Sequence, residues 1–192
     1  MQNIANKWVA NMIERLNKVT YPCLVIDIGT SRIPKSFDDE GSIRDVQILE
    51  CIMSYIENAK SEPEQSNVTY FDIKDSPEPM RKFVTTFNKY TESSCIIVAH
   101  NAETDIKLIQ GMAARLGMEM TSDIKVYCTM LNGAPYSKTH VYRGGKKVKK
   151  YPHLQELYRN LTGYDCGKGD IIDDLMMCFE CYKCLKEREM EE

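Results

Sequence analysis

Hydrophobic residues along the chain fall into blocks whose spacing alternates between that of strands and that of helices. Five apolar segments, bounded by polar or proline-containing stretches, predict strands: 21–28, 46–56, 68–73, 95–99 and 124–130. Helical spacing predicts helices over 80–90, 102–116, 153–161 and 170–188. Strands first and alternating helices and strands afterwards predict an α/β domain with a mixed central sheet, helices on its faces and an initial three-strand meander.

Residues 1–20 are predicted to form an amphipathic helical extension ahead of a domain that covers residues 21–192. Apolar side chains recur there at four-residue spacing between polar ones: Ile4, Trp8, Met12 and Leu16. This helix either packs on the domain or provides a contact for a dimer or another protein partner.

A basic hairpin is predicted around Gly144-Gly145, because a two-glycine turn suits a tight connection between strands. Its positive residues fall within eight positions, between Tyr142 and Tyr151: Arg143, Lys146, Lys147, Lys149 and Lys150. Such a cluster fits a grip on a nucleic-acid backbone, with a base stacked on a tyrosine. The alternative is a solvated loop.

The composition further limits the class of protein to which the chain can belong. The 192 residues, 43% of them hydrophobic and 28% charged, suit one globular domain. No apolar run approaches the roughly 20 residues of a membrane helix, and the N-terminus lacks the apolar block of a secretory signal. Eight cysteines, several within apolar stretches, favour a reducing compartment, so we expect an intracellular protein of cytoplasm or nucleus. A net charge of −3 argues against a basic surface that wraps duplex nucleic acid.

Three aspartates occupy positions where the pattern calls for apolar residues. Asp27 lies in the first strand, Asp105 shares a helical stripe with Ile109 and Met112, and Asp174 lies on the apolar stripe of the last helix. Taken singly, each suits a helix cap or an ion pair. Together they predict a site for magnesium or manganese, because clustered carboxylates without a cation are costly to bury.

These residues stand in motifs that resemble the DEDDh (DnaQ-like) family of 3′→5′ exonucleases, over about residues 21–187. Residues 24–34, LVIDIGTSRIP, are similar to the family's first motif, D-x-E-T-T-G-x-P after apolar residues. Residues 97–105, IVAHNAETD, are similar to its second motif, V-A-H-N-A-x-F-D, and give the most specific match. Residues 151–158 resemble its P-x-L-x-x-L-Y helix, and Asp174 with Cys178 behind it resembles its third motif.

The resemblance implies an RNase H-like exonuclease fold and a site at which Asp27, Asp105 and Asp174 are catalytic and hold two Mg²⁺ or Mn²⁺ ions. It implies nucleic-acid contacts from Thr30, His100 and Asn101 as well as from the basic hairpin. His100 has a second interpretation as a structural residue that holds the loop before Asn101.

Two positions depart from the family. Its motif-one glutamate corresponds to Gly29, and its catalytic histidine corresponds to Gly169, or to Lys168 if Asp173 replaces Asp174 in the alignment. Substitutes for the missing groups remain open: Glu50, Glu103, Asp170 or Asp173 for the ligand, and His100 or His140 for the base. We therefore expect a protein that binds single-stranded 3′ ends of DNA or RNA with impaired or lost hydrolysis. The alternative is a non-catalytic module that binds nucleic acid or a protein.

The spacing Cys178-x-x-Cys181-x-x-Cys184 also suggests a zinc site. Zinc sites normally pair such a motif with a second, distant one, so core cysteines are the favoured interpretation.

Overall fold

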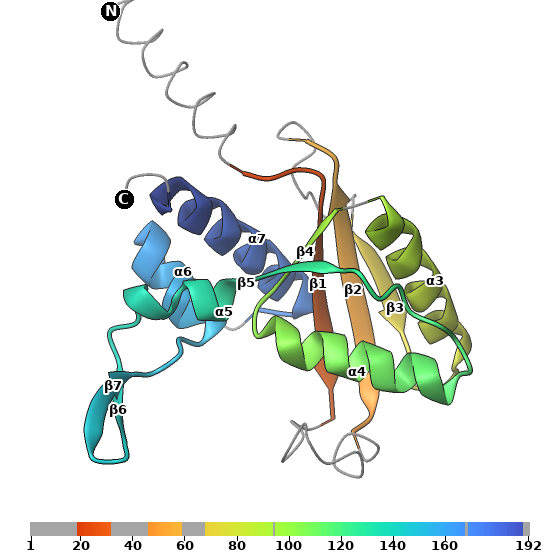
Figure 1. Cartoon of the computed structure of the whole chain (residues 1–192), viewed down its shortest axis with the longest axis horizontal. Coiled ribbons are helices and arrows are strands. Elements are labelled where there is room, and N and C mark those ends of the chain that lie inside the picture. Colours follow the sequence, from red (N-terminus) through yellow and green to blue (C-terminus); the bar gives the residue numbers. More distant parts are fainter. Residues whose placement is uncertain (1–18, 32–45, 59–67, 94, 168, 190–192) are drawn as a thin grey trace, which may run out of the picture.

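The computed structural model describes residues 19–31, 46–58, 68–93, 95–167 and 169–189 (Figure 1). The predicted N-terminal helix and Lys168 lie outside these ranges. The five strands form one sheet in the order β3-β2-β1-β4-β5. Their bounds follow the predicted apolar segments: β1 (Cys23–Thr30), β2 (Ile48–Ile56), β3 (Thr69–Asp72), β4 (Ile96–Ala99) and β5 (Lys125–Cys128).

The sheet is mixed, as expected. β1, β2 and β3 pair antiparallel and form the predicted meander, whereas β4 pairs parallel with β1 and β5 parallel with β4. Four longer helices accompany the strands: α3 (Glu78–Glu92), α4 (Ala102–Arg115), α6 (Leu154–Thr162) and α7 (Ile171–Arg188). None of the helices in the described ranges is both long and apolar enough to span a bilayer.

Alternate residues of β1 face two separate cores. Leu24 and Ile26 pack with side chains of α3 and α4, and Cys23 and Val25 pack with side chains of α6 and α7. Helices therefore cover both faces of the sheet (Figure 1). Because strand side chains alternate, Asp27 projects to the side that carries α6 and α7.

The predicted strand over 124–130 ends early. β5 stops at Cys128, and a short helix, α5 (Thr129–Asn132), begins with the fully buried Thr129. The hydroxyl of Thr129 lies 3.4 Å from the carbonyl oxygen of Ala99, to which it donates. A 3-10 turn, η2 (Ala134–Tyr136), follows. Apolar periodicity did not indicate either element because each is about one turn long.

The basic hairpin forms as predicted, with strands β6 (His140–Arg143) and β7 (Lys146–Lys149). Gly144 and Gly145 both have positive φ, 56° and 78°, which is the backbone that a two-residue turn of this kind needs.

Truncation inside the core should test this packing. Phe179 of α7 is 1% exposed, so Phe179→Ala should lower the free energy of unfolding by about 3–5 kcal/mol. Leu131→Ala, at a site 50% exposed, is the control and should change it by no more than about 0.5 kcal/mol. Urea denaturation followed by circular dichroism measures both. Equal losses from the two variants would contradict the packing of α7 on the sheet.

Candidate functional site

β1 carries the first acidic residue of the site. Asp27 lies opposite Ile52 of β2, and Gly29 lies opposite Glu50. Asp27, Gly29 and Glu50 share one face of the sheet because residues two apart, and residues paired across strands, project to the same side. Thr30 ends the strand, just after an irregularity in the register between Gly29 and Thr30.

The second aspartate arrives from the first turn of α4. β4 runs parallel to β1, with Val98 paired with Val25, so the chain leaves β4 level with Asp27. Asp105 then lies in α4 with only 6% of its surface exposed. Burial raises the pKa of Asp105, and the negative charge of Asp27 raises it further.

The third aspartate lies in the first turn of α7. Gln155 of α6 donates from Nε2 to Asp174 Oδ1 at 3.0 Å. Burial raises the pKa of Asp174, and the negative charges of Asp173 and Asp170 raise it further. The three aspartates thus come from β1, α4 and α7, and the charge of Asp174 helps to raise the pKa of Asp27.

A fourth carboxylate, from β2, completes the group. A Cβ added to Gly29 would lie 2.5 Å from Glu50 Cγ and 2.8 Å from Glu50 Oε1. The Glu50 side chain therefore occupies the space into which a side chain at position 29 would grow. Tyr70 of β3 donates its hydroxyl to Glu50 Oε2 at 2.7 Å.

The electrostatics of the site are those of crowded anions. Burial, followed by the charges of Asp174 and Glu50, raises the pKa of Asp27 to about 7, while the backbone amide of Ile28 partly opposes the rise. Burial is also the main cause of the raised pKa of Asp105. Near neutral pH, these groups gain from either a proton or a cation.

The donor set fits a hard divalent cation. Asp105 Oδ2 is buried and has no hydrogen-bond partner among the described residues. Carboxylate oxygens are the ligands that Mg²⁺ and Mn²⁺ prefer. Within the described ranges no three His, Cys, Asp or Glu side chains already stand as a ligand set, so the carboxylates would have to turn toward an ion.

His100 is committed to structural contacts. Its Nδ1 lies 3.0 Å from the Thr129 hydroxyl, and its Nε2 lies 3.1 Å from the carbonyl oxygen of Pro152. Burial lowers the pKa of His100 to about 4. A neutral ring whose nitrogens both have partners suits the structural interpretation rather than that of a general base.

Asn101 has a backbone reason to be asparagine. Its φ of 64° lies in the left-handed region, which asparagine tolerates better than most residues. Its side-chain amide donates to the Thr104 hydroxyl at 2.7 Å and fixes the turn into α4. That turn sets the direction in which Asp105 points.

The expected position of the catalytic histidine leaves no space for one. A Cβ on Gly169 would lie 2.3 Å from Asp173 Cβ. Asp173 and Asp170 form a capping box at the start of α7, in which each side chain accepts from the backbone of the other. Neither acid is therefore free to serve as a ligand or base without opening the helix end.

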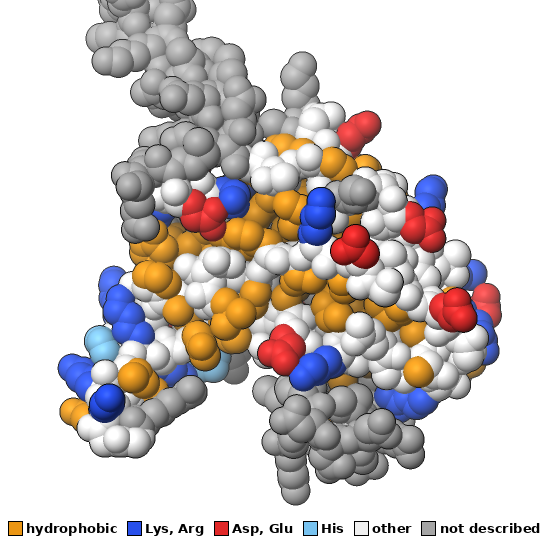
Figure 2. All heavy atoms as spheres, in the orientation of Figure 1, with side chains coloured by type: hydrophobic (Ala, Val, Ile, Leu, Met, Phe, Trp, Pro, Cys, Tyr) orange, Lys and Arg blue, Asp and Glu red, His pale blue; other side chains and the backbone are white. Residues whose placement is uncertain are grey.

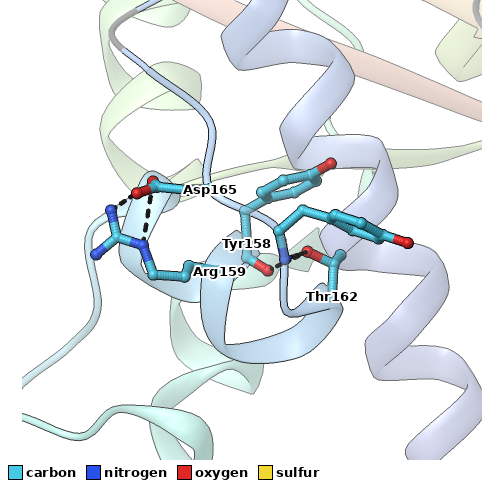
Figure 3. Close-up of polar contacts among 5 residues, drawn as sticks. Tyr158, Arg159, Thr162 and Asp165 are labelled. Carbon is cyan, nitrogen blue, oxygen red and sulfur yellow. Dashed lines mark hydrogen bonds and ion pairs between the residues drawn. The ribbon is translucent and has the colours of Figure 1, made fainter.

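The connection from α6 to α7 is also fixed upstream of Gly169 (Figure 3). Arg159 Nη2 and Asp165 Oδ1 form an ion pair at 2.7 Å. The Thr162 hydroxyl donates to the Tyr158 carbonyl at 2.8 Å and accepts from the Tyr164 amide at 3.2 Å. Local contacts thus shape this connection.

His140, a candidate base, and Glu103, a candidate ligand, lie outside the acidic site. His140 is exposed on β6. Glu103 is 72% exposed and pairs with Lys107 at 2.7 Å, as an i, i+4 ion pair on the outer surface of α4.

Positive side chains gather over β6 and β7, at the lower left of Figure 2. Tyr142 is 76% exposed and Tyr151 43% exposed beside them. Lys146, Lys147 and Lys149 are exposed and Lys150 is half-buried, with Lys150 Nζ lying 3.2 Å from His153 Nε2. The Arg143 side chain lies outside the described part of the structure.

The hairpin is joined directly to the acidic site. Its last strand leads through Pro152, whose carbonyl contacts His100, to Gln155, which contacts Asp174. The hydroxyls of Ser137 and Thr139 donate to Glu156 Oε1 at 3.3 Å and 2.9 Å and hold the base of the hairpin on α6.

The cysteine series of α7 belongs to the core. Cys178 and Cys181 are 2% and 0% exposed, and the Cys178 sulfur lies 3.8 Å from the Thr129 hydroxyl. Burial raises the pKa of both thiols. Protonated, buried thiols favour the core interpretation over a zinc site, which binds thiolates.

No protein-family model and no characterised protein sequence matches the chain. Among solved structures, it is similar to Pop2p of S. pombe in a form with bound Mg²⁺ and Mn²⁺. The two chains share 13% sequence identity and a TM-score of 0.53, over 96% of this chain and 88% of that one. Likeness at this identity establishes the architecture alone: the chain has an RNase H-like fold.

Proposed function

We propose that the protein binds the 3′ ends of single-stranded nucleic acid at a DEDDh-type divalent-metal site, with impaired or lost phosphodiester hydrolysis. The observation that supports this proposal is the buried Asp105 oxygen that has no hydrogen-bond partner among the described residues, with Asp27 and Asp174 acting electrostatically in the same region. Mg²⁺ or Mn²⁺ is the cation that such oxygens suit, and both are bound in the Pop2p structure.

Bound divalent ions would supply charge stabilisation for the attacking and leaving oxygens of a phosphodiester. Asp27, Asp105 and Asp174 would hold these ions, and Gln155 donates a hydrogen bond to Asp174. The chain itself offers no evident proton acceptor among its described residues. His100 is bound at both nitrogens, and the space at Gly169 belongs to Asp173. A missing general base typically costs about 10²–10⁴-fold in rate.

The basic hairpin supports a nucleic-acid ligand. Its lysines and exposed tyrosines combine the charge and the stacking surface that single strands need, and the hairpin leads straight to the acidic site. Nothing in these residues separates DNA from RNA.

A second candidate is a module of this fold that binds nucleic acid or a protein and does not cut. The absence of a free base near the carboxylates, among the residues that the structure describes, favours it. An intracellular location and a protein contact through residues 1–20 are parts of the proposal that rest on the sequence.

Stability without metal should depend on pH in a way set by Asp27. Its pKa of about 7 exceeds the roughly 3.9 of an unfolded chain, so the native state holds the proton more tightly. The contribution of Asp27 to the free energy of unfolding is therefore full below about pH 4, and it is lost as the pH rises through about 7. In EDTA, the free energy of unfolding should fall by more than about 1.4 kcal/mol between pH 5 and 8, and by clearly less in Asp27→Asn. Urea titrations measure it, with the exposed Asp123→Asn as control. Parallel profiles for wild type and Asp27→Asn would contradict the crowding of these carboxylates.

Hydrolysis should be slow or undetectable. With Mn²⁺ and 3′-labelled single-stranded DNA or RNA, digestion should run at least about 10²-fold below that of a DEDDh exonuclease assayed in parallel. Any residual cutting should disappear in Asp27→Ala and persist in Glu103→Ala, which removes an exposed acid outside the site. Rapid digestion that depends on Asp27 would show that the base has been supplied by another group and would remove the impaired-activity part of the proposal.

The hairpin should govern nucleic-acid affinity. Changing Lys146, Lys147, Lys149 and Lys150 to Glu should weaken binding of a single-stranded oligonucleotide by more than about 10-fold at low salt. The slope of log K against log salt should also flatten, by about 0.7 for each phosphate that the variant no longer neutralises. Fluorescence anisotropy measures both. A matched variant with Lys82 and Lys89 of α3 changed to Glu is the control. Unchanged binding in the hairpin variant would point to a protein partner.

A further inference from the structure

We propose that Glu50 of β2, positioned by Tyr70 of β3, supplies the fourth carboxylate of the metal site in the space left by Gly29. This inference rests on the proposed metal site and specifies its ligand set. Under this assignment the fourth carboxylate comes from β2, whereas the exonuclease motif would place it on β1.

The strand register makes the exchange geometrically possible. Gly29 and Glu50 are paired across β1 and β2, so side chains at the two positions grow from opposite strands toward the same volume. The 2.5 Å separation between a Gly29 Cβ and Glu50 Cγ shows that the two side chains exclude each other. Glycine at position 29 is thus what allows the Glu50 side chain to lie across β1, on the face from which Asp27 projects.

Tyr70 fixes the orientation of Glu50. Tyr70 is paired with Ile52, so its ring lies on the same face as Glu50, one diagonal position along β2. Its hydroxyl donates to Oε2 at 2.7 Å, while Oε1 is the oxygen that lies above Gly29. One oxygen is therefore held by the sheet and the other is directed to the site, and we assign Tyr70 as a positioning residue.

The site also holds a group that lacks a partner. Asp105 is only 6% exposed, and its Oδ2 has no hydrogen-bond partner among the described residues. Asp27, Gly29 and Glu50 project from one face of the sheet, because Gly29 is two residues from Asp27 and pairs with Glu50. A buried carboxylate oxygen that has no hydrogen-bond partner among the described residues indicates a cation as the missing partner.

The other acidic side chains considered as ligands already have hydrogen-bond or ion-pair partners. Asp170 and Asp173 cap α7, and Glu103 pairs with Lys107 on the surface. Glu50 is the acid that reaches the volume of the absent motif-one glutamate.

Calorimetric titration of Mn²⁺ into the metal-free protein tests the assignment. Glu50→Gln keeps the size of the side chain and its contact with Tyr70, and removes the charge. Its dissociation constant for Mn²⁺ should rise at least about 10-fold, the loss expected for disturbing a metal site. Glu57→Gln, at the exposed residue after β2, is the matched control and should match wild type.

A swap of the two side chains tests the geometry. Gly29→Glu combined with Glu50→Gly returns the carboxylate to β1 and clears the space that it needs. Its Mn²⁺ affinity should come within about 3-fold of wild type, given a circular dichroism spectrum that shows the fold is intact. If Glu50→Gln binds Mn²⁺ as wild type does, Glu50 is not a ligand, whatever the swap shows.

The Tyr70→Phe variant tests whether Tyr70 acts by positioning Glu50 or by stabilising the fold in general. In the wild-type background it should weaken Mn²⁺ binding about 3–10-fold, and in the Glu50→Gln background it should have no further effect. Equal losses in both backgrounds would show that Tyr70 acts without Glu50 and would remove its positioning role.

The same Mn²⁺ titrations distinguish failure of the Glu50 assignment from failure of the proposed metal site. If wild type fails to bind Mn²⁺, or if Asp27→Asn and Asp105→Asn bind it unchanged, the metal site itself is wrong. If those two variants lose binding while Glu50→Gln keeps it, the metal site stands and the assignment of Glu50 fails.

Discussion

The mutual repulsion of carboxylates held at one place on the sheet is the constraint on which the rest of the site depends. β1 carries Asp27, α4 begins after the turn at Asn101 and carries Asp105, and α7 begins at its capping box and carries Asp174. Each placement costs free energy unless a proton or a cation balances the charge, because burial and neighbouring anions both favour the neutral acids. The surrounding core holds them there through fully buried residues on both faces of the sheet.

Apolar periodicity predicted the sheet, the meander, four helices and the hairpin, because each is long enough to show its repeat. It missed α5 and η2, whose lengths of four and three residues are too short for a pattern. The three aspartates stand out in the sequence because each interrupts an apolar stripe, and their role as metal ligands stays a prediction. The role of Glu50 was left among several alternatives, since it depends on the pairing of β1 with β2. A sequence contains no direct record of strand register, so the contact between positions 29 and 50 emerges only from the folded sheet.

The two glycines that depart from the exonuclease motifs have different physical meanings. Gly29 faces a flexible carboxylate side chain that can take over the chemical role of the residue it replaces. Gly169 faces Asp173 Cβ, which belongs to the cap of α7 and brings no proton acceptor into the site. The first departure preserves negative charge, whereas the second exchanges a potential base for helix stability. The geometry therefore favours the proposed cation binding more strongly than rapid hydrolysis.

Under the proposed function, the distribution of charge links the binding of nucleic acid to the binding of metal. The lysines of β7 attract a phosphate backbone, and the chain between Lys150 and Gln155 leads from them to the carboxylates. A phosphate that reached Asp27 and Asp174 without a cation would meet like charge in a poorly solvated place. With divalent ions present the same place becomes attractive, so each ligand strengthens the binding of the other by the same factor. In the proposed function, the lysines would hold the backbone of a single strand, and a bound metal would allow its 3′ end to approach the acidic site.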